Sequence, residues 1–297
     1  MFLFSTRRIK LLLLLPSLIF FCVYVLYPVG FSLLTAFQDK PTYQPGRFIG
    51  FDNFAGMLAD DHLWSALKNT FIIVVLELAM IPVLSFLLGL FINMKFRGST
   101  IVKVLVFTPY VLSGIITTLV WFFIVDPRIG IINSLLGAFH IDTSSLLLIG
   151  GPTLTPFTVG VIETWKSLGF YSVLFMAGLK MIPAELYDAA AMDGAGAWRK
   201  FRHVTLAMIS PTALFNLVLG IIGAFQVFSI AFVATQGGPA YATWFYVYYL
   251  YQQGFNFYHM GYASAMAWIF LVIVLAFTYL QVRWSRRWVY YEGERQE

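Results

Sequence analysis

The chain has few charged residues and a single cysteine, and both shortages limit what it can be. Only 11% of its 297 residues are charged, whereas 60% are hydrophobic. Soluble domains carry roughly 25% charged residues, so this chain cannot cover a folded surface with polar side chains. Its one cysteine, Cys22, lies in an apolar run, which excludes any intrachain disulfide. We therefore expect residues 1–297 to form one all-α membrane domain.

The sequence also lacks the motifs of common catalytic and metal-binding sites. No G-x-x-x-x-G-K-S/T phosphate-binding loop is present, since Trp165 precedes Lys166-Ser167 where that motif requires glycine. The four histidines have no metal-ligand spacing, and neither G-x-S-x-G nor H-E-x-x-H occurs. We therefore expect this chain to be no enzyme and to bind no metal or cofactor.

Long hydrophobic runs are what the sequence has in abundance. A spanning helix needs about 20 mostly apolar residues, because its backbone polar groups must pair within the segment. Six stretches meet this requirement: 11–36, 69–94, 101–125, 155–180, 207–234 and 263–282. The first follows basic residues as a signal peptide does. Its apolar run is too long for a signal peptide and no cleavage site follows, so we predict a retained helix.

Basic residues are distributed unequally between the connecting loops. If both termini are cytoplasmic, 14 Lys and Arg residues lie inside and four lie outside. The inside residues are Arg7, Arg8, Lys10, Lys95, Arg97, Lys103, Lys180, Arg199, Lys200, Arg202, Arg283, Arg286, Arg287 and Arg295. The outside residues are Lys40, Arg47, Lys68 and Arg128. The net charge of +5 therefore reflects membrane topology and not a nucleic-acid surface.

The predicted outside loops are 37–67, 126–152 and 235–262. The first contains Asp52-Asn53 and Asp60-Asp61, which can each cap a short surface helix. Tyr and Trp residues in the other two are typical of a membrane–water interface. These loops could bind an outside partner or lie along the membrane, and the sequence leaves both possibilities open.

The stretch 183–206 between the fourth and fifth spans is unusual for a connecting loop. Good helix formers run from Pro183 to Met192, and Gly194 stands where a helix cap or tight turn is expected. A second helical run from Trp198 to Thr205 carries three basic residues. The pattern predicts a folded cytoplasmic helix–turn–helix, with a solvated loop as the alternative.

This stretch resembles the coupling loop of ABC importer permeases, whose pattern is E-A-A, three residues, Gly, nine residues, then I-x-L-P. Asp188-Ala189-Ala190 is followed by three residues and Gly194, and Val204-Thr205-Leu206-Ala207 stands nine residues later. Asp188 replaces the glutamate and Ala207 replaces the proline, so we expect the fifth span to begin with a weaker bend. The resemblance extends over about residues 10–285.

Further segments resemble the carbohydrate branch of these binding-protein-dependent permeases. They are Phe48-Ile49-Gly50-Phe51-Asp52-Asn53-Phe54, Ala66-Leu67-Lys68-Asn69-Thr70, Thr235-Gln236-Gly237-Gly238-Pro239 and Gly261-Tyr262-Ala263-Ser264-Ala265. The resemblance implies a type I importer permease fold, a sugar or sugar-like solute and a multi-pass location in a bacterial or archaeal inner membrane. It implies as partners a second permease, two ATPase subunits that hold ATP–Mg, and an extracytoplasmic solute-binding protein. The ATPase-coupling residues it implies are Glu185, Asp188, Ala189, Ala190, Asp193, Gly194 and Phe201.

Ionisable residues inside spans are costly and are therefore candidates for function. Glu77, Glu163 and Lys166 are the three in this chain. Glu163 and Lys166 are three residues apart and can pair, with Trp165 between them. The pair either neutralises itself within the helix bundle or lines a solute path. Glu77 is interpreted as a packing or topology feature.

The fifth span combines small residues with polar and aromatic ones. Gly220, Gly223 and Ala224 suit close helix packing, whereas Gln226 and Ser229 lie beside aromatic residues. Either packing or a solute cavity explains the pattern, and the family resemblance favours the cavity. The substrate-path candidates are Glu163, Trp165, Lys166, Gly220, Ala224, Phe225, Gln226 and Phe228, with Asn216 as a weaker one.

A secondary transporter is the main competing interpretation. It requires coupling-ion carboxylates at the membrane midplane and usually internal repeats. No clear repeat is present, and stretch 183–206 has no role in that scheme. A channel would need a filter-like loop, which the sequence does not contain.

The charge asymmetry predicts that both termini are cytoplasmic and that residues 126–152 lie outside. We expect an impermeant thiol reagent to label His140→Cys in intact cells and to leave Arg295→Cys unlabelled. Labelling at 295 with none at 140 would contradict this topology.

Overall fold

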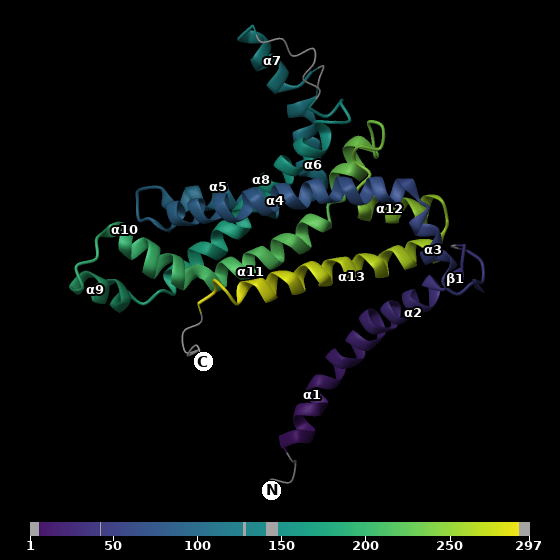
Figure 1. The fold of residues 1–297 in the computed structure, drawn as a ribbon, viewed down its shortest axis with the longest axis horizontal. Coiled ribbons are helices and arrows are strands. Elements are labelled where there is room, and N and C mark those ends of the chain that lie inside the picture. The colour runs from purple at the N-terminus through teal and green to yellow at the C-terminus, as the bar shows by residue number, and fades with distance from the viewer. Residues whose placement is uncertain (1–5, 42, 127–128, 141–147, 291–297) are drawn as a thin grey trace. The chain divides into compact units, whose positions relative to one another are not determined.

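The computed structural model describes residues 6–41, 43–126, 129–140 and 148–290, with side chains from residue 13 onward (Figure 1). The chain divides into two compact units. One consists of Met1–Asp60 and Leu250–Val272, and the other of Asp61–Tyr249 and Ile273–Glu297. Each unit is described by itself, and the single membrane domain expected from the sequence stays a prediction.

The first unit contains a long N-terminal helix, a short hairpin and the segments that pack against them. Its elements are α1 (Thr6–Phe21), η1 (Cys22–Leu26), α2 (Tyr27–Ala36), β1 (Gln38–Asp39), β2 (Arg47–Phe48), α3 (Asp52–Leu58), η4 (Gln252–Asn256) and the first half of α13 (Met260–Ser285). Asn53 donates hydrogen bonds to the carbonyls of Ala36 and Gln38. These bonds fasten α3 to the end of α2, because an amide with two donors can satisfy two unpaired carbonyls.

The second unit is a helical bundle with short segments around it. Its elements are α4 (Asp61–Asn93), α5 (Ser99–Val111), α6 (Gly114–Val125), α7 (Ile131–Ala138), α8 (Thr155–Lys180), α9 (Ala184–Met192), α10 (Ala197–Lys200), η2 (Phe201–Thr205), α11 (Leu206–Phe225), η3 (Ala231–Thr235), most of α12 (Tyr246–Tyr251) and the second half of α13. Helices α4, α8 and α11 pack against one another, and α5 packs on α8 (Figure 1).

Close approach between these helices depends on glycine. A Cβ at Gly169 of α8 would clash with the carbonyl oxygen of Val106 in α5. A Cβ at Gly89 of α4 would lie 2.8 Å from the Cβ of Phe175 in α8. Small residues let helix backbones approach in an apolar solvent, where van der Waals packing stabilises the bundle. The glycines therefore fix which faces of α4, α5 and α8 meet.

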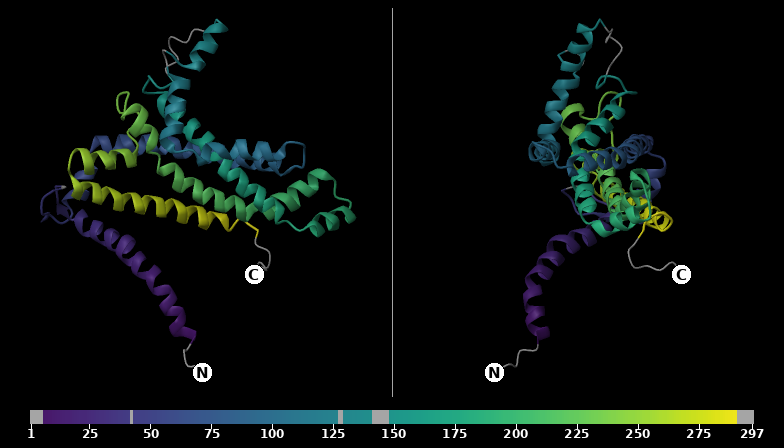
Figure 2. Two further views of the ribbon diagram at one scale, coloured as in Figure 1. Left: turned by 180° about the vertical axis from the view of Figure 1, so that it is seen from behind. Right: turned by 90° about the vertical axis from the view of Figure 1, so that its left-hand side faces the viewer.

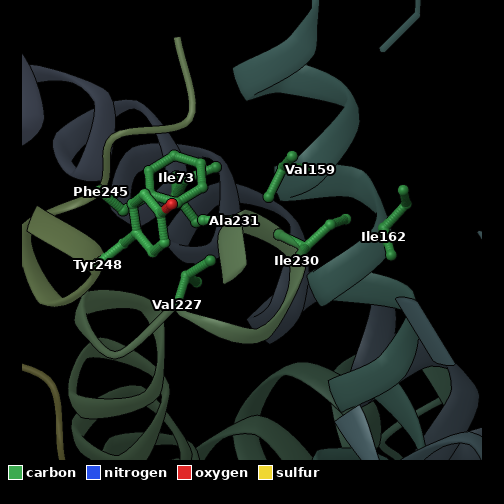
Figure 3. Close-up of a cluster of buried hydrophobic side chains, with 8 residues drawn as sticks. All are labelled: Ile73, Val159, Ile162, Val227, Ile230, Ala231, Phe245 and Tyr248. Carbon is green, nitrogen blue, oxygen red and sulfur yellow. The ribbon is translucent and has the colours of Figure 1, made fainter. Parts of the chain in front are cut away.

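A cluster of buried hydrophobic side chains joins the bundle to the segment after α11 (Figure 3). Ile73 of α4 and Val159 of α8 contribute from the long helices, and Phe245 contributes from the segment before α12. The remaining members are Ile162, Val227, Ile230, Ala231 and Tyr248. The cluster holds the irregular chain after Phe225 firmly against α4 and α8.

The spans differ from the sequence prediction mainly in where helices break. Within the described residues, four helices are long and apolar enough to cross a membrane: Leu13–Ala36, Asp61–Asn93, Ala197–Phe225 and Met260–Ser285. Two bent helix pairs raise this number to six if each pair counts as one span. The expected span 155–180 coincides with α8. The expected span 207–234 begins earlier, in α10, and ends at Phe225.

The continuous helix expected over 101–125 is wrong. Two helices, α5 and α6, replace it and meet at an angle of 100° (Figure 2). Leu112 and Ser113 between them have ψ values of 142° and 137°, which are extended and not helical. The hydrophobicity of this stretch gave no sign of the break, because both helices are apolar.

Of the two short surface helices predicted in 37–67, the described residues contain only α3, and the predicted capping is not observed. Helix α3 begins at Asp52 after Phe51, which makes no side-chain capping hydrogen bond. Asp61 begins the long helix α4 and not a separate short one. The loops predicted to lie outside also contain α7 and α12.

Candidate functional site

Helices α9 and α10 form a hairpin at the end of α8 (Figure 1). The break at Pro183 turns α9 by 60° from α8. Pro183 has no N–H to continue a helix, and Glu185 lies in the first turn of α9, where a carboxylate complements the helix dipole. The sequence prediction of a folded helix–turn–helix, in place of a solvated loop, therefore agrees with the geometry.

Gly194 closes α9 with a Schellman motif. Its φ is +74°, in the left-handed region that glycine adopts freely. Its N–H donates to the carbonyl of Ala191 at 3.0 Å, and the N–H of Ala195 donates to that of Ala190 at 2.9 Å. These two bonds satisfy carbonyls that the helix end leaves unpaired. The turn between α9 and α10 is thus set by one glycine and the backbone around it.

Two side chains connect this hairpin to the spanning helices. Phe201 packs on Trp198 with ring centroids 5.6 Å apart, and on Phe86 of α4 at 6.2 Å. Phe86 in turn meets Phe175 of α8 edge to face at 5.3 Å. The Tyr187 hydroxyl of α9 lies 3.0 Å from the Thr205 hydroxyl. Packed contacts therefore connect the hairpin to α4, α8 and the start of α11.

The coupling residues expected from the sequence fall into two groups. Glu185, Asp188, Ala189, Asp193 and Gly194 are exposed on the hairpin, as are the side chains of Met192 and Trp198. Ala190 and Phe201 are half-buried and hold the turn and the base of the hairpin. Tyr187 was missed, because an aromatic residue within a helical pattern gives no sign of its distant partner Thr205.

A polar cavity of about 350 Å³ lies within the second unit, between α4, α8 and the end of α11. Its walls combine ionisable, hydroxyl, amide and aromatic groups. The lining residues are Glu77, Tyr110, Glu163, Lys166, Ser167, Phe170, Tyr171, Leu219, Ile222, Gly223, Gln226, Val227, Phe228 and Ser229. Convergent polar groups among aromatic side chains are typical of a site for a small polar ligand.

The charges of this cavity are arranged around one ion pair. The Nζ of Lys166 lies 3.3 Å from the Oε2 of Glu163, and both side chains are mostly buried. Glu77, which is 4% exposed, lines the same cavity from α4. Burial makes an unpaired charge costly, so Lys166 and Glu163 stabilise each other's charged forms. Glu77 was interpreted from the sequence as a packing feature, and only the bundle brings it to this site.

The α5–α6 break lies beside the ion pair. A Cβ at Gly114, the first residue of α6, would be 2.7 Å from the Oγ of Ser229 and 3.5 Å from the Nζ of Lys166. Tyr110 of α5 stacks on Phe170 with ring centroids 4.5 Å apart. Irregular backbone at membrane depth is tolerated where protein covers it or where it lines a cavity. The kinked span therefore forms part of the cavity region.

The structure separates the other substrate-path candidates. Gln226 and Phe228 line the cavity, whereas Trp165 contacts Trp121 edge to face at 5.2 Å and does not line it. Phe225 is 1% exposed and packs between Phe71 and Phe277. The remaining candidates, which are buried and do not line the cavity, are Gly220 and Ala224.

Asn216 has a structural role. It is 1% exposed and donates a hydrogen bond to the carbonyl of Tyr171 at 3.1 Å, which joins α11 to α8. Tyr171 and Tyr110 line the cavity, but nothing in the sequence separated them from the other aromatic residues of the spans. A polar cavity is seen only once these helices are packed.

Comparison with known proteins identifies the family of this chain. The family described as binding-protein-dependent transport system inner membrane component matches residues 54–290. The chain belongs to this family. The probable ABC transporter permease protein YesP of Bacillus subtilis is 33% identical over 95% of this chain and 91% of that protein. The sn-glycerol-3-phosphate transport system permease protein UgpA of Yersinia pestis is 30% identical over 97% of this chain and 98% of that protein.

Comparison with solved structures agrees with this family assignment. Two crystal structures of a bacterial alginate ABC transporter, one of them with an alginate pentasaccharide-bound periplasmic protein, each superimpose with a TM-score of 0.81. Their identities are 27% and 25%, over 95% of this chain and 96% of theirs. The predicted membership of the binding-protein-dependent permeases and the predicted all-α type I permease fold are confirmed. This chain is thus a multi-pass transport component of the inner membrane.

The buried ion pair leads to a prediction about stability. Glu163→Leu leaves the Lys166 charge without its partner, and we expect a loss of about 3 kcal/mol in the free energy of unfolding. The double variant Glu163→Leu/Lys166→Met removes both charges and is expected to regain most of this loss. Thermal unfolding of the purified variants measures both effects. Equal destabilisation by the single and double variants would show that the pair is not the cause.

Proposed function

We propose that the chain is one permease of an ABC importer and forms, with a second permease, the path for a sugar or sugar-like solute. ATP hydrolysis takes place in two separate ATPase subunits, and an extracytoplasmic binding protein delivers the solute. The exposed hairpin α9–α10 is the observation on which this mechanism rests. The chain lies in a bacterial or archaeal inner membrane with both termini in the cytoplasm.

The hairpin suits docking to a separate protein. It exposes Met192 at 88% and Trp198 at 69%, next to the carboxylates of Glu185 and Asp188. Exposed apolar side chains rimmed by charges are typical of protein–protein contacts. The sequence contains no phosphate-binding loop of its own, so the energy of ATP hydrolysis has to enter through such a contact.

The same helices that hold the hairpin also line the cavity. Phe201 contacts Phe86 of α4, and α4 carries Glu77 into the cavity. Helix α8 runs from the cavity residues Glu163 and Lys166 to the base of α9. Movement of a docked ATPase therefore changes the cavity by tilting α4 and α8, which is a means of alternating access.

The cavity chemistry supports a hydroxyl-rich solute. Gln226, Ser229 and Tyr171 offer amide and hydroxyl groups, while Phe228 and Phe170 offer aromatic faces. Sugars combine hydroxyls with apolar ring faces, so such a mixture can bind them. The names of UgpA and of the alginate transporter, which refer to glycerol phosphate and a polysaccharide, agree with this class.

A secondary transporter is the alternative, favoured only by the presence of Glu77 and Glu163 in one cavity. Intramembrane carboxylates can couple transport to an ion gradient. Uptake into vesicles distinguishes the two mechanisms. An importer requires ATP on the cytoplasmic side, whereas uptake by this chain alone, driven by an ion gradient, would contradict the proposal.

The cavity residues lead to a prediction about solute affinity. Phe228→Ala removes an aromatic wall and Gln226→Ala a hydrogen-bonding group. We expect each to raise the KM for uptake of a radiolabelled sugar by roughly 2- to 10-fold. Phe225→Ala is the matched control, because Phe225 packs outside the cavity. We expect it to lower the free energy of unfolding by about 3–5 kcal/mol without a selective effect on KM. An unchanged KM in Phe228→Ala and Gln226→Ala would exclude this cavity from the solute path.

The Schellman turn leads to a prediction about coupling. Gly194→Val places a β-branched residue at φ +74°, which costs about 1–3 kcal/mol locally although the space around it is open. Gly196→Val is the matched control, because Gly196 has a φ of −69° and an equally open environment. We expect Gly194→Val to insert normally but to lose the stimulation of ATP hydrolysis by loaded binding protein in reconstituted vesicles. Stimulation equal to that of Gly196→Val would mean that the hairpin is not the coupling element.

A further inference from the structure

A second, apolar groove lies in the same unit between α4, α11 and the C-terminal half of α13. It measures about 460 Å³. Leu78 of α4, Leu217 of α11 and Leu280 of α13 form its walls, and Trp284 and Trp288 lie at one end. None of its lining residues belongs to the polar cavity, so it is a separate feature of the bundle.

The groove extends about as deep as one leaflet of a bilayer. Its deepest residue on α13 is Phe277, and the helix ends eight residues later at Ser285. At 1.5 Å per residue this is a depth of about 12 Å. The hydrocarbon core of a membrane is about 30 Å thick, so each leaflet contributes about 15 Å. Trp284 and Trp288 mark the end where an interfacial aromatic belt is expected.

Two buried polar atoms remain unsatisfied in residues that line this groove. The Nε1 of Trp288 and the Oε1 of Gln281 have no hydrogen-bond partner among the described residues. The Nε2 of Gln281 is occupied, because it donates to the carbonyl of Leu217 at 3.2 Å. Buried donors and acceptors are normally paired, since each unmade hydrogen bond is costly. Both atoms are covered by protein, so a polar group in the groove can pair with them only after a neighbouring side chain moves.

Three arginines lie next to Trp284 and Trp288 in the sequence. Arg283, Arg286 and Arg287 are exposed around Trp284 and Trp288, and none forms an ion pair with a carboxylate in the described part of the chain. No carboxylate lines the groove. Basic residues near the end of an apolar groove attract an anionic headgroup that carries a hydrocarbon chain.

We propose that this groove binds an anionic glycerophospholipid of the surrounding bilayer. One acyl chain lies between Leu78, Leu217 and Leu280, and the phosphate faces the three arginines. The proposal does not depend on the solute or on the ATPase partner.

The dimensions favour a lipid over a second membrane helix. A spanning helix needs a contact surface about 30 Å long, whereas this groove ends after about 12 Å. A helix also brings no negative charge to the arginines unless it carries acidic residues at its end. A phospholipid supplies the charge and the half-membrane length together.

Native mass spectrometry of the purified full chain provides the test. The protein is taken from vesicles of equal phosphatidylglycerol and phosphatidylcholine, and the lipid retained on it is identified. We expect phosphatidylglycerol to predominate. Arg286→Gln/Arg287→Gln should reduce that preference on the order of tenfold. The matched control is Lys95→Gln/Arg97→Gln, which removes two basic residues from another loop on the same predicted side and should leave the preference unchanged.

A second pair of variants tests the groove itself. Leu280→Trp fills the groove, whereas Leu275→Trp adds the same bulk to α13 outside it. The two leucines are 58% and 57% exposed, so neither substitution is expected to unfold the protein. We expect only Leu280→Trp to lose the retained phosphatidylglycerol. Equal retention of both lipids by the parent protein, or equal retention by Leu280→Trp and Leu275→Trp, would overturn the proposal. Loss of a co-purified second permease from Leu280→Trp with lipid retention unchanged would also overturn it, in favour of a helix.

Discussion

In the hydrocarbon of a membrane no water is present to accept the hydrogen bonds of the peptide backbone, so each spanning segment has to be helical or covered by protein. The long helices α4, α8, α11 and α13 satisfy this constraint directly. The α5–α6 break also satisfies it, because Gly114 packs against Ser229 and Lys166. Polar side chains and irregular backbone therefore gather in one place, and that place is the cavity.

The bundle has a closely packed region, where α4 and α8 meet and hold the hairpin, and a polar region, which is the cavity. Helices α4 and α8 approach closely at Gly89, which leaves little freedom for one to slide past the other. Aromatic contacts at Phe86 and Phe201 extend this rigid packing to the hairpin. The cavity, by contrast, is lined by polar and aromatic groups from α4, α5, α8 and the end of α11. The hairpin is thus joined by close packing to the helices that line the cavity.

Much of the architecture could be predicted from local features. Hydrophobic runs of about 20 residues give spans, because the solvent demands helices of that length. The spacing from Asp188 to Gly194 gave the turn, since a helix end that needs a positive φ selects glycine wherever the chain lies in the bundle. The fold class, the hairpin and the family follow from such signals. Each depends on residues that lie close together in the sequence.

The cavity depended on contacts between distant segments. The sequence suggested that Glu77 is a packing residue and that Phe225 and Trp165 line the solute path. In the structure Glu77 lines the cavity, whereas Phe225 and Trp165 pack against other aromatic residues. An apolar helix carries almost no periodicity to say which face is inward, because lipid and protein interior are equally apolar. The sequence by itself therefore determined that the chain crosses the membrane and where the hairpin between the fourth and fifth spans turns. Only the tertiary structure decided which side chains share a cavity, because helix rotation is set by interhelical packing at positions such as Gly89 and Gly169.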